Sequence, residues 1–172
     1  MPLGERDGIG QRGGEAHPVP VLSLGDAAMK NLRVVMEPNA PNQLKEGIQW
    51  RLEIYNVAAT GLAEYYPVSI FLRDGNEEVL GGLLGNIWGK WLYVRHLWVA
   101  ESVRQRGYGT QLLLAAEGYA MERGCGNVEL HTFSFQARPF YEQLGYEVFA
   151  ALDDYPPGHT KYFLRKRLAG DG

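Results

Sequence analysis

The feature that most constrains the fold is the segment 67–99, in which apolar runs are separated by two short turns. Asp74-Gly75-Asn76 supplies the first turn and Gly89-Lys90 the second, so three strands joined by hairpins are expected. A helical run from about Tyr108 to Arg123 and a strand-like segment, residues 127–133, follow. Because a strand–helix–strand unit needs a crossover, the strands before and after this helix should pair in parallel. The sequence therefore predicts a mixed α/β sheet with helices on its faces.

The remaining segments are expected to extend and cover this sheet. In chain order they are a strand (residues 31–38), a helix (43–60), a short helix (135–145) and two closing strands (146–152 and 161–168). In the first helix, Ile48, Leu52 and Tyr55 have the spacing of one apolar stripe, which we expect to be buried. Pro139 is compatible with the short helix only in its first turn, and Gly124 is placed to end the long helix.

The composition is that of an ordinary globular protein. The chain has 172 residues, 45% of them apolar and 22% charged, which suits one domain with a core of its own. Its net charge of -3 argues against a general nucleic-acid binder, which is normally basic. Residues 1–28 are rich in Gly and Pro and lack periodicity. We therefore expect a flexible N-terminal tail or over-long start over 1–28 and a single domain over 29–172.

Cysteine and histidine usage bears on location and on metal binding. Cys125 is the single cysteine and has no partner for an internal disulfide, and the N-terminus has no apolar signal core. No apolar run approaches the roughly 20 residues that span a bilayer. A cytoplasmic protein without a membrane partner is therefore expected. The four histidines are scattered and no spacing typical of metal ligands occurs, so no metal is expected.

A basic loop that contains two glycines, residues 104–109 (RQRGYG), lies between the third strand and the long helix. Glycine lets several backbone N–H groups turn toward one point, and the first N–H groups of a helix have no internal partner. Such an arrangement favours an anion, above all phosphate. The P-loop pattern needs Gly-Lys-Ser/Thr, which does not occur here, and the dinucleotide fingerprint fails at Leu112. Glu129 stands where a ribose-binding acid would, so a dinucleotide site and a plain basic turn both stay open at this point.

Two motifs in this part of the chain resemble those of the GNAT superfamily of acetyl-CoA-dependent N-acetyltransferases. The first is [QR]-x-x-G-x-[GA] after a strand that ends in a Leu-x-Val-like triplet, here residues 104–109 after residues 97–99. The second is Ala-x-x-x-Tyr in a helix that ends in Gly-Tyr, here residues 137–146. The order of elements agrees as well, and the resemblance covers roughly Met29 to Leu168.

The resemblance implies a GNAT acyltransferase fold: a mostly antiparallel sheet, a splayed parallel strand pair around Leu92–Val99 and Asn127–Phe133, and helices on both faces. It also implies acetyl-CoA as co-substrate, with the pantetheine arm between the splayed strands and the pyrophosphate on the loop. Family members often have Asn seven residues before the motif tyrosine, where this chain has Ser134. The cofactor-binding residues implied in this way are Leu97, Trp98, Val99, Arg104, Gln105, Arg106, Gly107, Tyr108, Gly109, Thr110 and Ser134.

The resemblance further implies a reaction. In such enzymes the neutral substrate amine attacks the thioester directly, and the CoA thiolate that leaves needs a proton. Tyr141 matches the position of the family's general acid for that proton. The implied acceptor is a primary amine on a small molecule or on a protein or peptide. A module of the same fold that binds CoA or acyl-CoA without catalysis is the alternative.

The sequence leaves the general base and the acceptor contacts open. Strand alternation predicts two faces for the third strand, one with Tyr93, Arg95, Leu97 and Val99, the other with Val94, His96 and Trp98. The candidate bases are His96, His131, Glu53, Glu64, the Asp153-Asp154 pair and water. The candidate acceptor contacts are Tyr93, Arg95, His131 and Tyr155. No nucleic-acid partner is expected, and the resemblance allows a homodimer.

Overall fold

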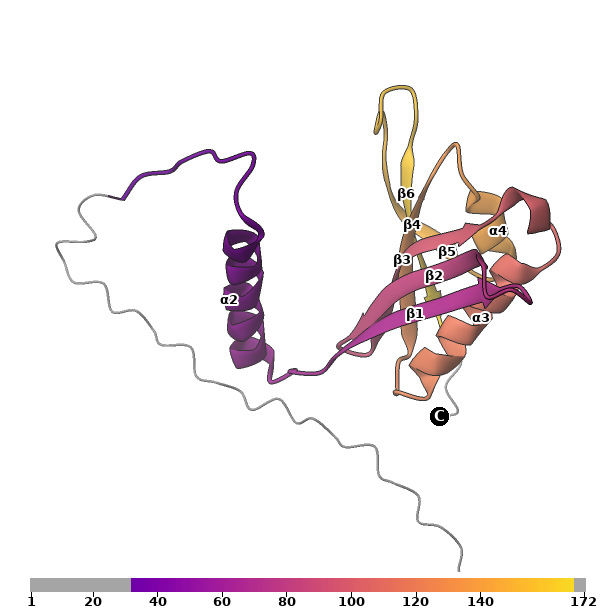
Figure 1. Cartoon of the computed structure of the whole chain (residues 1–172), viewed down its shortest axis with the longest axis horizontal. Coiled ribbons are helices and arrows are strands. Elements are labelled where there is room, and N and C mark those ends of the chain that lie inside the picture. Colours follow the sequence, from indigo (N-terminus) through magenta and orange to yellow (C-terminus); the bar gives the residue numbers. More distant parts are fainter. Residues whose placement is uncertain (1–31, 169–172) are drawn as a thin grey trace, which may run out of the picture. The chain divides into compact units, whose positions relative to one another are not determined.

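The computed structural model describes residues 32–168, so the expected tail over residues 1–28 lies outside the described part of the chain. The chain divides into two compact units between Lys45 and Glu46. Figure 1 labels the helices and strands. They are α2 (Asn42–Thr60), β1 (Tyr65–Arg73), β2 (Val79–Trp88), β3 (Trp91–Val99), the short 3-10 helix η1 (Glu101–Val103), α3 (Tyr108–Met121), β4 (Asn127–Phe133), α4 (Arg138–Gln143), β5 (Glu147–Leu152) and β6 (Lys161–Arg167).

The strand expected over residues 31–38 does not form in the described part of that segment, residues 32–38. The six strands of the sheet all come from residues 65–167. The apolar side chains of the segment, among them Val34 and Met36, are exposed. A strand is held by its ladder to a neighbour, so apolar character alone does not produce one. The prediction of a strand here is wrong for the described residues.

The first predicted helix is confirmed as α2, but its expected buried stripe is not. Ile48, Leu52 and Tyr55 are 68%, 58% and 69% exposed, and no residue of α2 is buried. Periodicity shows which side chains share a helix face, whereas burial also needs a partner packed on that face. The prediction of burial for these three residues is therefore wrong. Within residues 32–168, no helix combines the length and the apolar character that crossing a membrane requires.

The mixed sheet predicted from the strand pattern is confirmed. Its strand order is β1-β2-β3-β4-β6-β5. The hairpin strands β1, β2 and β3 pair antiparallel, β4 pairs with β3 in parallel, and β6 pairs antiparallel with both β4 and β5. Figure 1 shows α3 and α4 packed on one face of this sheet. The parallel pair thus lies in the middle of an otherwise antiparallel sheet.

The two hairpin turns form where their residues predict them. The carboxylate of Asp74 accepts hydrogen bonds from the backbone N–H groups of Asn76 at 2.9 Å and Glu78 at 2.8 Å, which closes the first turn. Gly89 and Lys90 both have positive φ, 56° and 67°, as a two-residue turn between twisted strands requires. These turns hold β1 to β3 in register.

The core lies between the sheet and α3. Its largest fully buried side chains are Leu83, Leu92, Leu113, Leu130, Leu164 and Val128. Leu113 comes from α3 and the other five from the central strands, so α3 is tied to the strands that part at the functional site. Gly124 has a φ of 73° just after α3, and Pro139 lies in the first turn of α4, both as predicted. Cys125 is buried in this core, and burial raises the pKa of its thiol.

A buried carboxylate connects α3 to the end of the sheet. Glu117 of α3 is 4% exposed. It accepts a hydrogen bond from the Tyr146 hydroxyl at 2.8 Å and one from the Lys166 ammonium at 2.7 Å. Tyr146 immediately precedes β5, and Lys166 belongs to β6. Both carboxylate oxygens are therefore paired, which makes burial of this charge tolerable.

Candidate functional site: a cleft between parting strands

A cleft of about 1040 Å³ opens where β3 and β4 separate. The parallel ladder joins Trp91–Val94 only to Asn127–Leu130, although both strands continue beyond it. Past this point β3 still pairs with β2, but its edge toward β4 has no ladder partner. The walls of the cleft are the ends of β3 and β4, the loop after β3, and α4. The splayed parallel pair expected from the resemblance is therefore present.

A bulge in β3 changes which side chains point into this region. The register with β2 shifts between Leu84 and Gly85, which pair with His96 and Val94, so Arg95 is left as the extra residue. Beyond the bulge, Leu97 and Val99 pack against the core, on the same side as Val94.

The strict alternation predicted for this strand is thus wrong beyond Arg95. His96 and Trp98 share the face of Tyr93, whereas Leu97 and Val99 leave it. A one-residue insertion reverses the faces of every residue that follows it. Nothing in the spacing of apolar residues in this strand indicates the bulge.

The loop after β3 has the backbone shape that an anion site needs. Gln105 and Gly107 have left-handed φ values of 60° and 80°, and Gly107 is the N-cap of α3. The first bond of the helix runs from Gln111 N–H to the Gly107 carbonyl at 3.0 Å. The N–H groups of the three residues between them have no partner within the helix. These N–H groups, at the end of α3 that lines the cleft, are available to bind a negatively charged group.

The two arginines of the loop differ in their positions. Arg104 lines the cleft, and its Nε donates a hydrogen bond to the Val99 carbonyl at 3.0 Å, so it braces the end of β3 against the loop. Arg106 is not among the cleft-lining residues. Gly109 lies beside α4, since a Cβ there would be 3.4 Å from the Phe140 ring, an ordinary contact distance. Arg104 thus links the loop to the end of β3.

Tyr141 projects from α4 into the cleft and is 8% exposed. Its ring contacts Phe140 and Tyr146 edge-on, with centroids 5.0 Å and 5.9 Å apart. Burial raises the pKa of its hydroxyl above the usual value of 10.0. The phenol therefore keeps its proton throughout the neutral range, as a proton donor must.

Ser134 does not line the cleft. Its hydroxyl is 3.2 Å from His159 Nδ1 and accepts a hydrogen bond from the Thr160 N–H, also at 3.2 Å. These contacts tie the end of β4 to the loop before β6. The neighbouring Gln136, which the sequence did not single out, does line the cleft, and its Oε1 accepts hydrogen bonds from the Thr132 hydroxyl and the Phe133 N–H.

His131 lies on β4 one residue beyond the last ladder pair and lines the cleft. Its Nδ1 is 3.3 Å from the Tyr93 hydroxyl. Burial, the Lys161 ammonium and His96 together lower the pKa of its imidazole from 6.5. The neutral imidazole is therefore favoured at neutral pH.

Other predicted acceptor residues have different positions. Arg95 lines the cleft, but its guanidinium donates to Asn86 Oδ1 at 3.2 Å and to the Tyr65 hydroxyl at 2.9 Å. Tyr155 does not line the cleft, although its ring packs edge-on against Phe133. Glu129, the residue considered for a ribose, does not line it either.

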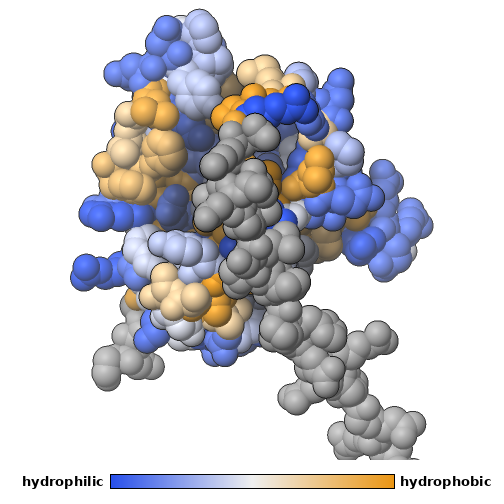
Figure 2. Space-filling model, turned by 90° about the vertical axis from the view of Figure 1, so that its left-hand side faces the viewer, coloured by the Kyte–Doolittle hydropathy of each residue, from blue (hydrophilic) through white to orange (hydrophobic). Residues whose placement is uncertain are grey.

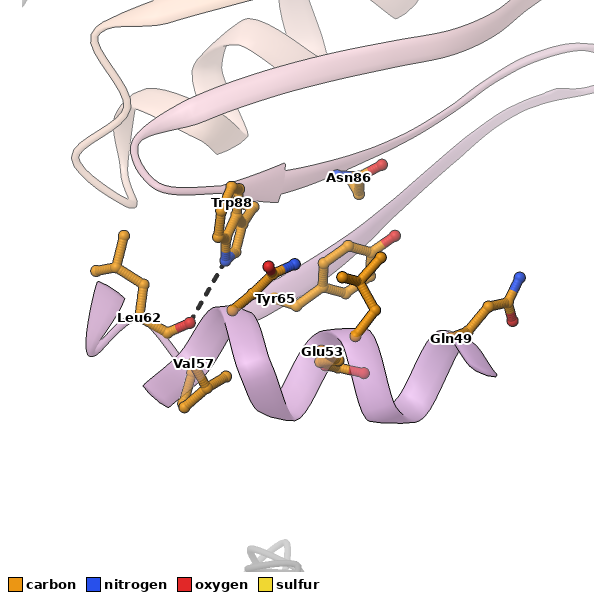
Figure 3. A pocket seen from close by; sticks show the side chains of 10 residues that line it. Gln49, Glu53, Val57, Leu62, Tyr65, Asn86 and Trp88 are labelled. Atoms are coloured by element: carbon orange, nitrogen blue, oxygen red, sulfur yellow. Dashed lines mark hydrogen bonds between the residues drawn. The ribbon is translucent and has the colours of Figure 1, made fainter. Parts of the chain in front are cut away.

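A second cavity of about 370 Å³ is lined by part of α2 and by β1 and β2 (Figure 3). Glu53 of α2 lines it, together with Tyr65 and Asn86, the two partners of Arg95. Trp88 at its edge donates a hydrogen bond to the Leu62 carbonyl at 3.4 Å. Glu53, a candidate base on sequence grounds, therefore belongs to this cavity and does not line the cleft.

The structure brings most of the sequence-predicted site together. Of the predicted cofactor-binding residues, all but Arg106 and Ser134 line the cleft, and Tyr141 lines it as well. The lining residues that sequence reasoning missed include Phe133, Phe135, Gln136 and Phe140. The first three precede the motif of residues 137–146 and Phe140 lies within it, and only the fold shows that they line the cleft. Among residues 32–168, no three His, Cys, Asp or Glu side chains are grouped as a metal site would need.

Two aromatic side chains of the cleft lining reach the surface. Trp98 and Phe135 line the cleft and are each about half exposed. Apolar side chains also reach the surface elsewhere on the molecule, as the space-filling view shows (Figure 2).

Comparison with known proteins gives these features a family. Residues 34–146 match the model of the acetyltransferase (GNAT) family. Blasticidin-S acetyltransferase from Streptomyces morookaense is 42% identical over 113 residues, which cover 63% of this chain and 83% of that protein. The crystal structure of an acetyltransferase from Bacillus cereus is 35% identical, with a TM-score of 0.69 over 78% of this chain and 98% of that one.

A more distant structure shares the fold. It is an acetyltransferase from Bacillus anthracis in complex with acetyl coenzyme A, 16% identical, with a TM-score of 0.54 over 60% of this chain and 64% of that one. At this identity the likeness concerns the fold alone. The family match spans most of the chain, including both recognised motifs, and the parted strands, the glycine loop and the buried tyrosine agree with it. The chain is therefore an acetyltransferase of the GNAT family.

Proposed function

We propose that this enzyme transfers the acetyl group of acetyl-CoA to a primary amine of a small molecule, by direct attack of the amine on the thioester. The observation that carries the proposal is the unpaired edge of β3 at Leu97–Val99, which lines the same cleft as the loop that caps α3. An arm that contains amides needs backbone partners, and a pyrophosphate needs converging N–H groups. The cleft offers both along one path.

In this proposal the residues divide by task. The free edge of Leu97, Trp98 and Val99 pairs with the pantetheine arm, and the N–H groups around Gly107 bind the pyrophosphate. Arg104 keeps the two parts in register through the Val99 carbonyl. Arg106 adds positive charge beside the phosphates from outside the cleft. Acetyl-CoA itself supplies the reactive thioester.

Tyr141 is proposed as the proton donor. The amine nitrogen forms a bond to the acetyl carbon, the carbon–sulfur bond breaks, and the sulfur leaves with the bonding pair. The Tyr141 hydroxyl gives its proton to that sulfur and regains one from solvent. Its raised pKa keeps it protonated until this moment.

The acceptor is proposed to be a small molecule of low positive charge. Among the described residues that line the cleft none is acidic, whereas Arg95 and Arg104 carry positive charge. Such a cleft does not attract a polycation. The relative named blasticidin-S acetyltransferase points in the same direction, toward a small-molecule amine.

An acetyl-CoA thiol-release screen tests the function. The panel should contain amine-bearing nucleoside antibiotics, amino acids, aminoglycosides, polyamines and peptides. We expect release with one or more small amines of low charge and none with peptides. Release with peptides alone would contradict the acceptor class, and CoA binding without release on any amine would contradict catalysis.

A further inference from the structure

We propose that His131 accepts the proton of the incoming amine, with Tyr93 and Lys161 as positioning residues around its imidazole. This inference rests on the proposed acetyl transfer and names the base that the reaction needs. An amine is protonated at neutral pH and cannot attack until one proton is removed. Neither the sequence motifs nor the family match assigns a residue to that step.

The position of His131 suits the task. The ladder between β3 and β4 ends at the pair Val94–Leu130. His131 is therefore the first β4 residue beyond it, at the open gap. The imidazole is half-buried and lines the same cleft as Tyr141 and the free edge of β3. A base there lies on the path between the acceptor and the thioester.

Rings and a hydroxyl hold the imidazole in place. The Tyr93 hydroxyl is 3.3 Å from Nδ1. Phe133 packs edge-on against the ring at a centroid distance of 6.1 Å, and Phe163 lies tilted at 6.3 Å. With Nδ1 facing Tyr93, the base tautomer carries its proton on Nδ1, donates it to the Tyr93 oxygen and leaves the Nε2 lone pair free.

The charges around His131 disfavour its protonated form. Lys161 of β6 and His96 of β3 lie on the two strands that neighbour β4. Both lower the pKa of the His131 imidazole, so they disfavour a positive charge on it. The Lys161 ammonium is itself held over the Phe163 ring at 5.0 Å and the Tyr155 ring at 5.5 Å. Glu129, two residues earlier on the same strand, is in register with Arg165 of β6.

The carboxylates of the Asp153-Asp154 pair are engaged elsewhere. Asp153 accepts a hydrogen bond from the Thr160 hydroxyl at 3.1 Å, and Asp154 accepts one from the Gly158 N–H at 2.7 Å. Both therefore shape the loop before β6. His96 also lines the cleft, but it is exposed and has no ring or hydroxyl partner among the contacts of the described residues. It is the natural control for His131.

The proton balance is complete without a further reagent. Nε2 of His131 takes one proton from the ammonium form of the acceptor and passes it to solvent. The neutral amine attacks the acetyl carbon, and the nitrogen gives its second proton to water as the amide forms. Tyr141 protonates the departing sulfur, so the reaction yields the amide, free CoA and one net proton.

The test compares His131→Asn with His96→Asn by the pH dependence of kcat/KM, using an acceptor amine whose pKa is above about 9. For the unaltered enzyme we expect an acid limb below 6.5, the ordinary value of histidine. His131→Asn should lose roughly 100-fold in kcat/KM at neutral pH and lose this limb. His96→Asn should keep this limb and move it toward higher pH, because His96 is one of the groups that lower the pKa of His131. CoA affinity should be unchanged in both, which shows that the fold and the loop are intact.

Two further variants test the positioning residues. Lys161→Met should move the acid limb toward higher pH, because one positive neighbour is removed. Tyr93→Phe should lower kcat and shift the His131 ring signals in nitrogen NMR, since the tautomer loses its partner. Full activity and an unchanged limb in His131→Asn would overturn the inference while leaving acetyl transfer intact. No turnover of any amine by the unaltered enzyme would instead reject the proposed function, and the base with it.

Discussion

At the scale of single residues, we expect the affinity for CoA to depend more on the backbone conformation of Gly107 than on the charge of its neighbour Arg106. Gly107 has a φ of 80°, which directs the N–H groups of the α3 end into the cleft. Only glycine adopts this conformation without strain. Arg106 contributes a charge that solvent screens, because it lies outside the cleft lining.

Gly107→Val should therefore weaken CoA binding more than Arg106→Ala does. We expect a loss of roughly 100-fold for the valine variant, because a β-branched residue cannot keep the left-handed φ. The arginine variant should lose about tenfold or less. Titration calorimetry with CoA measures both, and thermal unfolding checks that each variant is folded. A larger loss in Arg106→Ala would contradict the backbone account.

Tyr141→Phe removes a proton but keeps the ring and its packing against Phe140 and Tyr146. We expect kcat to fall roughly 100-fold with CoA affinity unchanged, because the leaving sulfur loses its donor. Tyr119→Phe, on α3, is the matched control and should leave kcat unchanged. If turnover of Tyr141→Phe equals that of the unaltered enzyme across the pH range, the proton comes from another group.

At the scale of elements, α3 is fixed to the sheet by the Glu117–Lys166 pair as well as by apolar packing. The Glu117 carboxylate is buried, so loss of Lys166 leaves a charge without its counter-ion. Arg165, the next residue along β6, makes an exposed ion pair with Glu147 at 2.8 Å. The same strand thus offers a buried pair and an exposed pair for direct comparison.

Lys166→Met should destabilise the protein by about 3 kcal/mol, because an uncompensated buried carboxylate remains. Arg165→Met should cost less than about 1 kcal/mol, as exposed pairs do. Urea unfolding followed by circular dichroism measures both free energies. Equal losses in the two variants would mean that the Glu117 pair is not an anchor of α3.

The sequence predicted those elements that depend on nearby residues. It did not predict those that depend on how one strand pairs with another. The Asp74 turn, the Gly89-Lys90 turn and the Gly124 end of α3 depend on nearby residues, and all three are confirmed. The bulge at Arg95 depends on how β2 and β3 align, which alternation within one strand does not record. The strand expected over residues 31–38 failed for the same reason, since a strand needs a partner.

At the scale of the whole molecule, the sheet type and most of the cleft followed from the sequence. The crossover through α3 requires the parallel pair, and the resemblance placed the cofactor residues along its parted ends. The predicted contact at Ser134 depends on loop geometry that spacing does not reveal, and its hydroxyl pairs with the loop before β6. Tertiary proximity also joined His131 to Tyr93 and Lys161, which lie far apart in the chain.

The central claim is that acetyl-CoA lies along the free edge of β3 with its pyrophosphate on the loop before α3. Amide chemical shifts, followed by NMR during titration with CoA, test it most directly. We predict that the largest changes occur at Leu97–Val99 and Gln105–Thr110, with smaller ones at Tyr141 and His131. Changes confined to the residues that line the second cavity, such as Glu53 and Trp88, would contradict the account.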